Sequence, residues 1–229
     1  ASTSVALRSS PAVRTLRRSE NDTTMTYDRD YILRMAREFA TFLARIVRSK
    51  DEGRTETALA DLDQAAREHV GLGMDVLEAL PIEQLTLMLS IGGGLDVNRA
   101  YATGRLLAER ADMARGVGND ALAATLDGNA LGLLVDAALA FGGFLNEEHH
   151  DVVADVSDRL LASPAPLAPT LVCALLDAYQ RFGSDADLMR ITDALVRRAD
   201  ASVDRMTAVR IATKSACPEV VGRVASRLA

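Results

Sequence analysis

Apolar residues recur every three or four positions along most of the chain, a spacing that gives an α-helix one buried face. Between residues 28 and 49 this face consists of Tyr31, Ile32, Met35, Ala36, Phe39, Phe42, Leu43, Ile46 and Val47. The same period predicts further helices over residues 55–70, 74–80, 82–89, 97–115, 119–144, 147–162, 169–182 and 185–198, and two shorter ones within 202–228. The two-residue alternation of a strand is not sustained anywhere, so the pattern predicts an all-α fold.

Short glycine-containing links separate three pairs of these helices, at Gly53, Gly118 and Gly183. Because such links leave no room for a long crossover, each pair is predicted to be an antiparallel hairpin, and the hairpins are expected to stack. Polar residues that can cap a helix follow two of these glycines, with Asn119 and Asp120 in one link and Ser184 and Asp185 in another.

Other glycines interrupt the helical pattern. Gly92, Gly93 and Gly94 predict a flexible loop, and the run lacks the following Gly-Lys-Ser/Thr and the preceding strand of a phosphate-binding loop. Within the long pattern 119–144, Gly128, Gly132 and Gly142–Gly143 each weaken a helix by about 1 kcal/mol relative to alanine. They indicate close helix packing or a break between Phe141 and Phe144.

The hairpin turns are similar to the tetratricopeptide repeat, in which a turn glycine is followed by small residues that let two helices approach. Gly53 is followed by Ala58 and Ala65, and Gly118 by Ala123 and Ala130, at the same spacing. Gly183 is followed by leucines instead, and the bulky aromatic and proline positions of the repeat are missing. The similarity is therefore degenerate, and it implies a tetratricopeptide-like α–α superhelix.

Three segments resemble an uncharacterised bacterial family of short, tetratricopeptide-like helical proteins. They are Asp30-Tyr31-Ile32-Leu33-Arg34-Met35, Gly93-Gly94-Leu95-Asp96 and Gly118-Asn119-Asp120. The resemblance covers about residues 27–134. It implies a helical fold and carries no activity, cofactor or site residue.

The first 24 residues differ from the rest of the chain: they are rich in serine and threonine and have four arginines, but no acid before Glu20. No apolar periodicity is present, so the segment 1–24 is expected to be disordered. It fits a transit peptide, a basic tail that contacts an acidic partner, or an extension upstream of a start at Met25. Residues 25–145 are predicted to form the tetratricopeptide-like region, and 146–229 a C-terminal helical region packed on it.

Composition limits which classes of partner and which cellular location are expected. The net charge of −6 over 229 residues argues against nucleic acid, which needs a concentrated basic face. The longest apolar stretch, 131–145, is shorter than the roughly 20 residues of a membrane span and is expected to be a central buried helix. Cys173 and Cys217 lie in helical patterns without zinc-site spacing, which favours buried thiols in a reducing compartment, and a cytoplasmic location is expected.

The densest cluster of potential metal ligands is Glu147-Glu148-His149-His150-Asp151. On a helix, Glu147 shares a face with His150 and with Asp151, which suits a divalent ion if another segment supplies ligands. The simpler interpretation is that the acids stabilise a helix N-terminus, with the histidines solvated beside them. We therefore predict no metal, cofactor or catalytic residue.

Three weaker candidates have structural explanations. His69 is a lone histidine without a nucleophile nearby in the sequence, and the stripe Tyr31, Phe39 and Phe42 fits a core as well as a partner helix. The acidic residues of the second helix are expected to form a solvated face; they are Glu56, Asp61, Asp63 and Glu68.

The sequence as a whole predicts a non-catalytic helical scaffold that binds a protein or peptide, or a second copy of itself, in a groove between hairpins. The alternative is a small helical enzyme or ligand-binding protein with a site near Glu147–Asp151.

Overall fold

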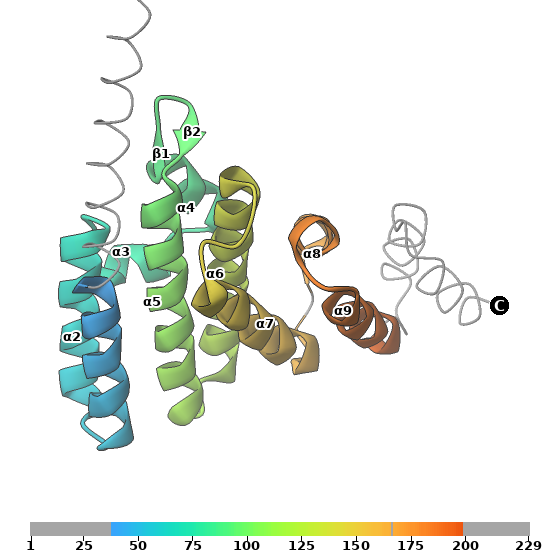
Figure 1. Cartoon of the computed structure of the whole chain (residues 1–229). Coiled ribbons are helices and arrows are strands. Elements are labelled where there is room, and N and C mark those ends of the chain that lie inside the picture. The colour runs from blue at the N-terminus through green and yellow to red at the C-terminus, as the bar shows by residue number, and fades with distance from the viewer. Residues whose placement is uncertain (1–37, 166, 199–229) are drawn as a thin grey trace, which may run out of the picture. The chain divides into compact units, whose positions relative to one another are not determined.

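The computed structural model describes residues 38–165 and 167–198, with side chains up to Leu195 (Figure 1). The chain divides into two compact units, residues 1–44 and 45–229. In the first unit the described residues 38–44 are helical, with Phe39 buried and Phe42 half-buried. The predictions for residues 1–24, for Tyr31, for the helices within 202–228 and for Cys217 lie outside the described residues.

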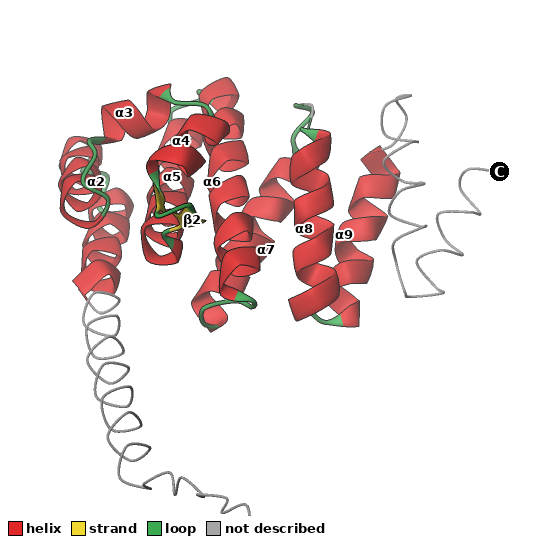
Figure 2. Cartoon of the chain, turned by 90° about the horizontal axis from the view of Figure 1, so that it is seen from above, coloured by secondary structure: helices red, strands yellow, loops and turns green. Residues whose placement is uncertain are grey.

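The described part of the second unit is built almost entirely from helices, which confirms the all-α class (Figure 2). A helix that ends at residue 51 is followed by α2 (Thr55–His69), α3 (Met74–Ala79), α4 (Ile82–Met88), α5 (Val97–Gly116), α6 (Asp120–Phe141), α7 (Glu147–Ala162), α8 (Pro169–Phe182) and α9 (Asp185–Arg198).

The first turn reverses the chain as predicted. Gly53 adopts a φ of +72°, a left-handed conformation that side chains disfavour, and its N–H donates to the carbonyl of Lys50. The helix before it and α2 then run antiparallel, since Arg45 pairs with Asp61 at 3.0 Å.

The pair α5 and α6 also doubles back, at Gly118, whose φ is +77°. Asn119 caps α6 by accepting a hydrogen bond from the N–H of Leu122. The two helices approach closely at Gly104, where an added Cβ would lie 2.7 Å from Cγ of Leu134. A glycine at this point lets the α5 backbone contact the α6 side chain directly.

Helices α7 and α8 both contact α6, and α9 contacts α7 and α8 (Figure 1). Ser184 caps α9 by accepting from the N–H of Asp187. The turn glycine before it differs from the other two: Gly183 has a φ of −86°, and it is required because a Cβ would collide with Tyr179.

The structure corrects one prediction about the glycine segments and confirms another. The triple glycine is not a structureless loop: Gly92 and Gly93 form the turn of a two-stranded ribbon, β1 (Ser90–Ile91) and β2 (Gly94–Leu95), and Gly94 pairs with Ile91. Gly92 and Gly93 both have positive φ, which is the geometry of a tight hairpin turn. The predicted break after Phe141 is confirmed, because Gly142 ends α6 with a φ of +81°.

Helix α6 is the central core helix of the described region. Its 22 residues fall within the predicted helix 119–144 and extend beyond the apolar stretch 131–145 toward the N-terminus, and it is the one described helix long and apolar enough to cross a membrane. However, 61% of its apolar window is buried inside the protein, against α5, α7 and α8. Burial among other helices is what the sequence predicted for this stretch.

Candidate functional site

One face of α6 carries small side chains along most of its length. The residues on this face are Ala121, Ala124, Thr125, Gly128, Asn129, Gly132 and Asp136, which recur every three to four positions. No bulky α6 side chain covers this face. Ile82 of α4 contacts it at Gly132, where an added Cβ would lie 3.1 Å away, but a Cβ at Gly128 would meet nothing within 4 Å, so a hollow remains beside this part of the helix.

The hollow has a volume of about 900 Å³ and is open to solvent along one side. Its walls come from α4, α6, the end of α7, the segment before α8, and α8 itself. The lining residues outside α6 are Ile82, Glu83, Thr86, Leu160, Ala165, Leu167, Ala168, Thr170, Leu171 and Ala174. The walls are mostly apolar, which is typical of sites that bind a ligand or a partner segment. We call this hollow the α6 groove.

A second hollow, of about 620 Å³, adjoins the groove toward the start of α6. Ala121, Ala124, Leu160 and Ala165 line both. The α6 positions along the two hollows run from Asp120 to residue 136, which at 1.5 Å per residue is about 24 Å. The α6 face therefore offers an elongated site.

Asp136 brings a carboxylate to the α6 groove without a partner. Within the described part of the chain it makes no hydrogen bond and no ion pair, and it is half-buried. Burial raises the pKa of this carboxyl above its usual value, and no neighbouring cation opposes the rise. An uncompensated charge in an apolar wall weakens folding, so it indicates a functional position.

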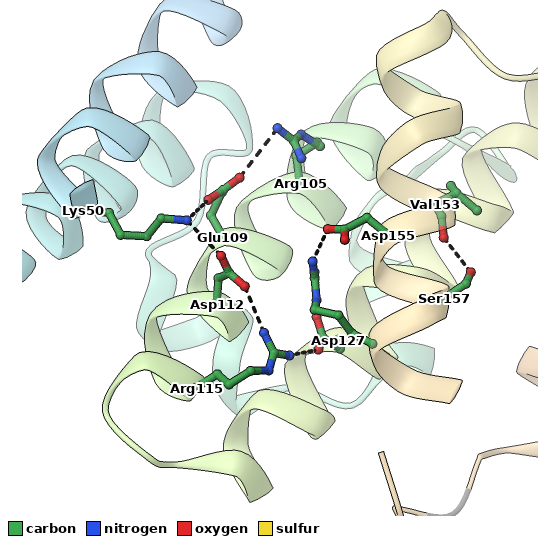
Figure 3. Close-up of polar contacts among 10 residues, drawn as sticks. Lys50, Arg105, Glu109, Asp112, Arg115, Asp127, Val153, Asp155 and Ser157 are labelled. Atoms are coloured by element: carbon green, nitrogen blue, oxygen red, sulfur yellow. Dashed lines mark hydrogen bonds and ion pairs between the residues drawn. The ribbon is translucent and has the colours of Figure 1, made fainter. Parts of the chain in front are cut away.

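The second hollow ends at a charged cluster that is internally paired. Asp127, almost fully buried, accepts hydrogen bonds from Arg115 and from Arg159, the latter at 3.1 Å. The three residues come from α5, α6 and α7, so the cluster ties these helices together. Figure 3 labels Arg115 and Asp127 of this cluster. Both arginines are occupied by this carboxylate.

The same network extends to the helix that ends at residue 51 (Figure 3). Lys50 contacts Glu109 at 3.2 Å and Asp112 at 2.9 Å. Burial alone would lower the pKa of Lys50, but the two acids outweigh it and raise the pKa. Asp112 responds in the opposite sense: burial would raise its pKa, and the ammonium of Lys50 brings it below the usual value. These contacts are a structural network along α5.

The fold does not bring the residues Glu147–Asp151 together as a ligand set, and the expectation that the histidines are solvated is wrong for His149. Its ring is fully buried, with Nε2 2.9 Å from the carbonyl of Leu134 and Nδ1 accepting from the N–H of Leu145 at 3.2 Å. Burial lowers the pKa of His149 to about 4, so the ring is neutral near pH 7. Edge-on contacts with Tyr101 and Phe144 complete its surroundings.

The other histidine of the cluster, His150, lies between two acids. Its ring is 3.4 Å from Asp187 of α9 and 3.6 Å from Asp151, and both Glu147 and Asp151 are exposed. No group of three or more potential ligands in the described ranges is placed to hold a metal ion. The acids at the start of α7 sit where the helix dipole favours negative charge, and Asn146 caps the helix.

The other sequence candidates do not gather at the α6 groove. His69 and Cys173 are half-buried on α2 and α8, and neither lines the groove. The acidic face of α2 is only partly solvated: Glu56 and Glu68 are exposed, whereas the side chain of Asp61 is 15% exposed and pairs with Arg45.

Asp136 is the residue that sequence reasoning missed. It lies within the apolar stretch 131–145, which the sequence predicts to be a central buried helix. The available signal was its position four residues after Gly132 and eight after Gly128, which places a lone acid on the small-residue face of a helix that is otherwise apolar.

No family model, curated protein or solved structure matches this chain. The resemblance to a tetratricopeptide-like bacterial family therefore stays a prediction, and the geometry of the α6 groove is what bears on function.

Proposed function

We propose that this chain is a non-catalytic helical scaffold, with its hairpins stacked in a tetratricopeptide-like superhelix, that binds a protein or peptide segment in the α6 groove. The observation that carries the proposal is the groove itself, with its small apolar walls, a length of about 24 Å along α6 together with the adjoining hollow, and one carboxylate without a partner among the described residues.

The dimensions favour a polypeptide over a small molecule. A volume of 900 Å³ is at the upper end of small-molecule pockets, which run from about 300 to 1,000 Å³, and the adjoining hollow lengthens the site further. Glycine and alanine contribute little area of their own, so affinity depends on how much surface the occupant brings. A polypeptide can cover the whole face.

The experiment uses a photo-crosslinking amino acid placed at Thr125, an exposed position on the floor of the groove, in cell extract. Val117 is the control position, because it is 70% exposed and does not line either hollow. A partner crosslinked from Thr125 and not from Val117 is then purified, and its affinity is measured by calorimetry.

Two glycine substitutions decide whether the groove is the binding site. A Cβ at Gly128 or at Gly116 meets nothing within 4 Å, but only Gly128 lines the groove. Gly128→Leu should fill the groove and weaken the partner at least tenfold, whereas Gly116→Leu should leave affinity unchanged. Equal affinities for both variants would refute the proposal.

A further inference from the structure

We infer that the α6 groove takes an α-helical segment that places one lysine or arginine against the carboxylate of Asp136, with small apolar residues on either side. This inference rests on the proposed function and specifies its occupant.

The helical conformation follows from the groove walls. Most of the lining comes from helices α4, α6 and α8, whose backbone groups are already hydrogen-bonded along each helix. An extended peptide would bury N–H and C=O groups that find no partner on such walls, and each would weaken binding. A helix satisfies its own backbone groups and can lie on the glycine and alanine face of α6.

The length supports the same occupant. Small residues at positions 121, 124 and 128 are spaced as one ridge of a helix, so a second helix can approach α6 closely there, next to Ile82 of α4, which contacts Gly132. Over about 24 Å the groove matches roughly four turns, or about 16 residues, of a helical ligand.

The cation follows from the charges that face the site. In the main hollow the charged residues are Glu83 and Asp136. In the adjoining hollow they are Arg115, Asp120, Asp127 and Arg159. Both arginines there already bind Asp127, so among the described residues the negative charge of the groove is not compensated.

Asp136 is the specific contact because it is desolvated before the ligand arrives. An exposed carboxylate would exchange water for the ligand's cation with little gain, whereas a half-buried carboxylate gains a partner that the described residues do not supply. The long apolar stem of lysine or arginine can lie on the alanine walls while its charged end reaches the acid.

The test is a selection from a displayed library of 16-residue helices, each carried in a self-folding helical hairpin with one face randomised. The full chain is the target, and binders that also bind Gly128→Leu are removed. We expect the remaining helices to share a lysine or arginine at one position. Replacing it by glutamine should weaken binding at least tenfold to the unmodified chain and less than twofold to Asp136→Asn.

Charge reversal provides the matched experiment. Asp136→Lys should select helices with glutamate or aspartate at the same position, and circular dichroism of both Asp136 variants checks that they fold. Groove-dependent helices that lack a basic residue, or that bind Asp136→Asn as tightly as the unmodified chain, overturn this inference and leave the proposed function standing.

Two further outcomes separate the possible occupants. A library that gives no binder sensitive to Gly128→Leu, although Gly116→Leu behaves as the unmodified chain, removes the proposed function and this inference together. Self-association in sedimentation equilibrium that Gly128→Leu abolishes would identify a second copy of the chain as the occupant and overturn the inference of a separate basic helix.

Discussion

The buried ring of His149 makes a specific prediction about acid stability. Its pKa in the folded chain is about 4, against 6.5 for a solvated histidine, because burial disfavours the charged ring. Above pH 6.5 the ring is neutral in both states and its contribution is complete. As the pH falls below 6.5 the unfolded chain binds a proton that the folded chain excludes, so stability is lost until the pH reaches about 4.

The magnitude follows from the interval between the two pKa values. At about 1.4 kcal/mol per pH unit, the interval from 6.5 to about 4 corresponds to a loss of about 3 kcal/mol from this one group. Protonation would also end the hydrogen bond from the N–H of Leu145 to Nδ1, since a charged ring has no acceptor.

The assay is urea unfolding followed by circular dichroism between pH 7.5 and pH 4, on the unmodified chain and on His149→Gln. Glutamine keeps a donor for the carbonyl of Leu134 and does not titrate, so subtracting the two curves removes the contribution of the carboxyl groups. The variant should be less stable at pH 7.5 by about 1–2 kcal/mol. Acidification should shift this difference by about 3 kcal/mol in favour of the variant, so that its sign reverses near pH 4.

A second readout guards against compensation elsewhere. The ring resonance of His149, assigned by its absence from His149→Gln, should titrate near pH 4 in the folded chain. A stability difference that stays flat over this pH range, or a ring that titrates near 6.5, would show that His149 is solvated and that its place between α6 and α7 is wrong.

Three further predictions follow from the packing. Gly104→Ala should destabilise the fold by roughly 1–3 kcal/mol, because its Cβ would lie 2.7 Å from a leucine side chain, whereas Gly116→Ala should be neutral or stabilising; thermal unfolding that moves both variants in the same direction would contradict the α5–α6 contact. Asp127→Ala should lower the free energy of unfolding, measured in urea, by roughly 2–3 kcal/mol. This is a small loss for a buried ion pair, because the two arginines are partly solvated. A change below 0.5 kcal/mol, the usual size for a surface site, would mean that the cluster is not structural. Asp136→Asn should stabilise the chain near pH 7 by about 1 kcal/mol, and this gain should fade as acid protonates the raised-pKa carboxyl; no gain at pH 7 would indicate a cation beside it.

Replacing Asp127 is expected to destabilise the chain, whereas replacing Asp136 is expected to stabilise it, because the two acids have different surroundings. Both lie on α6, and both are at least half-buried. Asp127 has two arginines and holds three helices together, whereas Asp136 has no partner within the described residues. A residue that weakens folding and faces an open groove is a better candidate for binding than one that the fold itself needs.

The candidate site was predictable only in part. A groove between hairpins follows from the prediction of stacked helices, but its position beside Asp136 depends on which α6 face is left uncovered. The sequence drew attention instead to His149 and its neighbours, because titratable residues close together in sequence suggest a ligand set. In the structure the ring of His149 is buried and His150 lies beside Asp187 of α9, so these residues do not form a ligand set.

The sequence by itself determined the helices and their ends, because a 3.6-residue apolar period and local capping residues act over a few positions only. Gly53, Asn119 and Gly142 end or begin helices through their own backbone and side-chain geometry. These features need no distant contact.

Tertiary structure alone decided which positions line a cavity, which charged side chains form ion pairs and which side chains pack against a neighbouring helix. Gly104 is crowded by α6 and Gly128 faces open space, although both are glycines within helices. Lys50 finds its acids about sixty positions away, and the ring of His149 reaches back to a carbonyl of α6. Such contacts depend on how helices pack against one another, and periodicity along the chain carries no information about the facing helix.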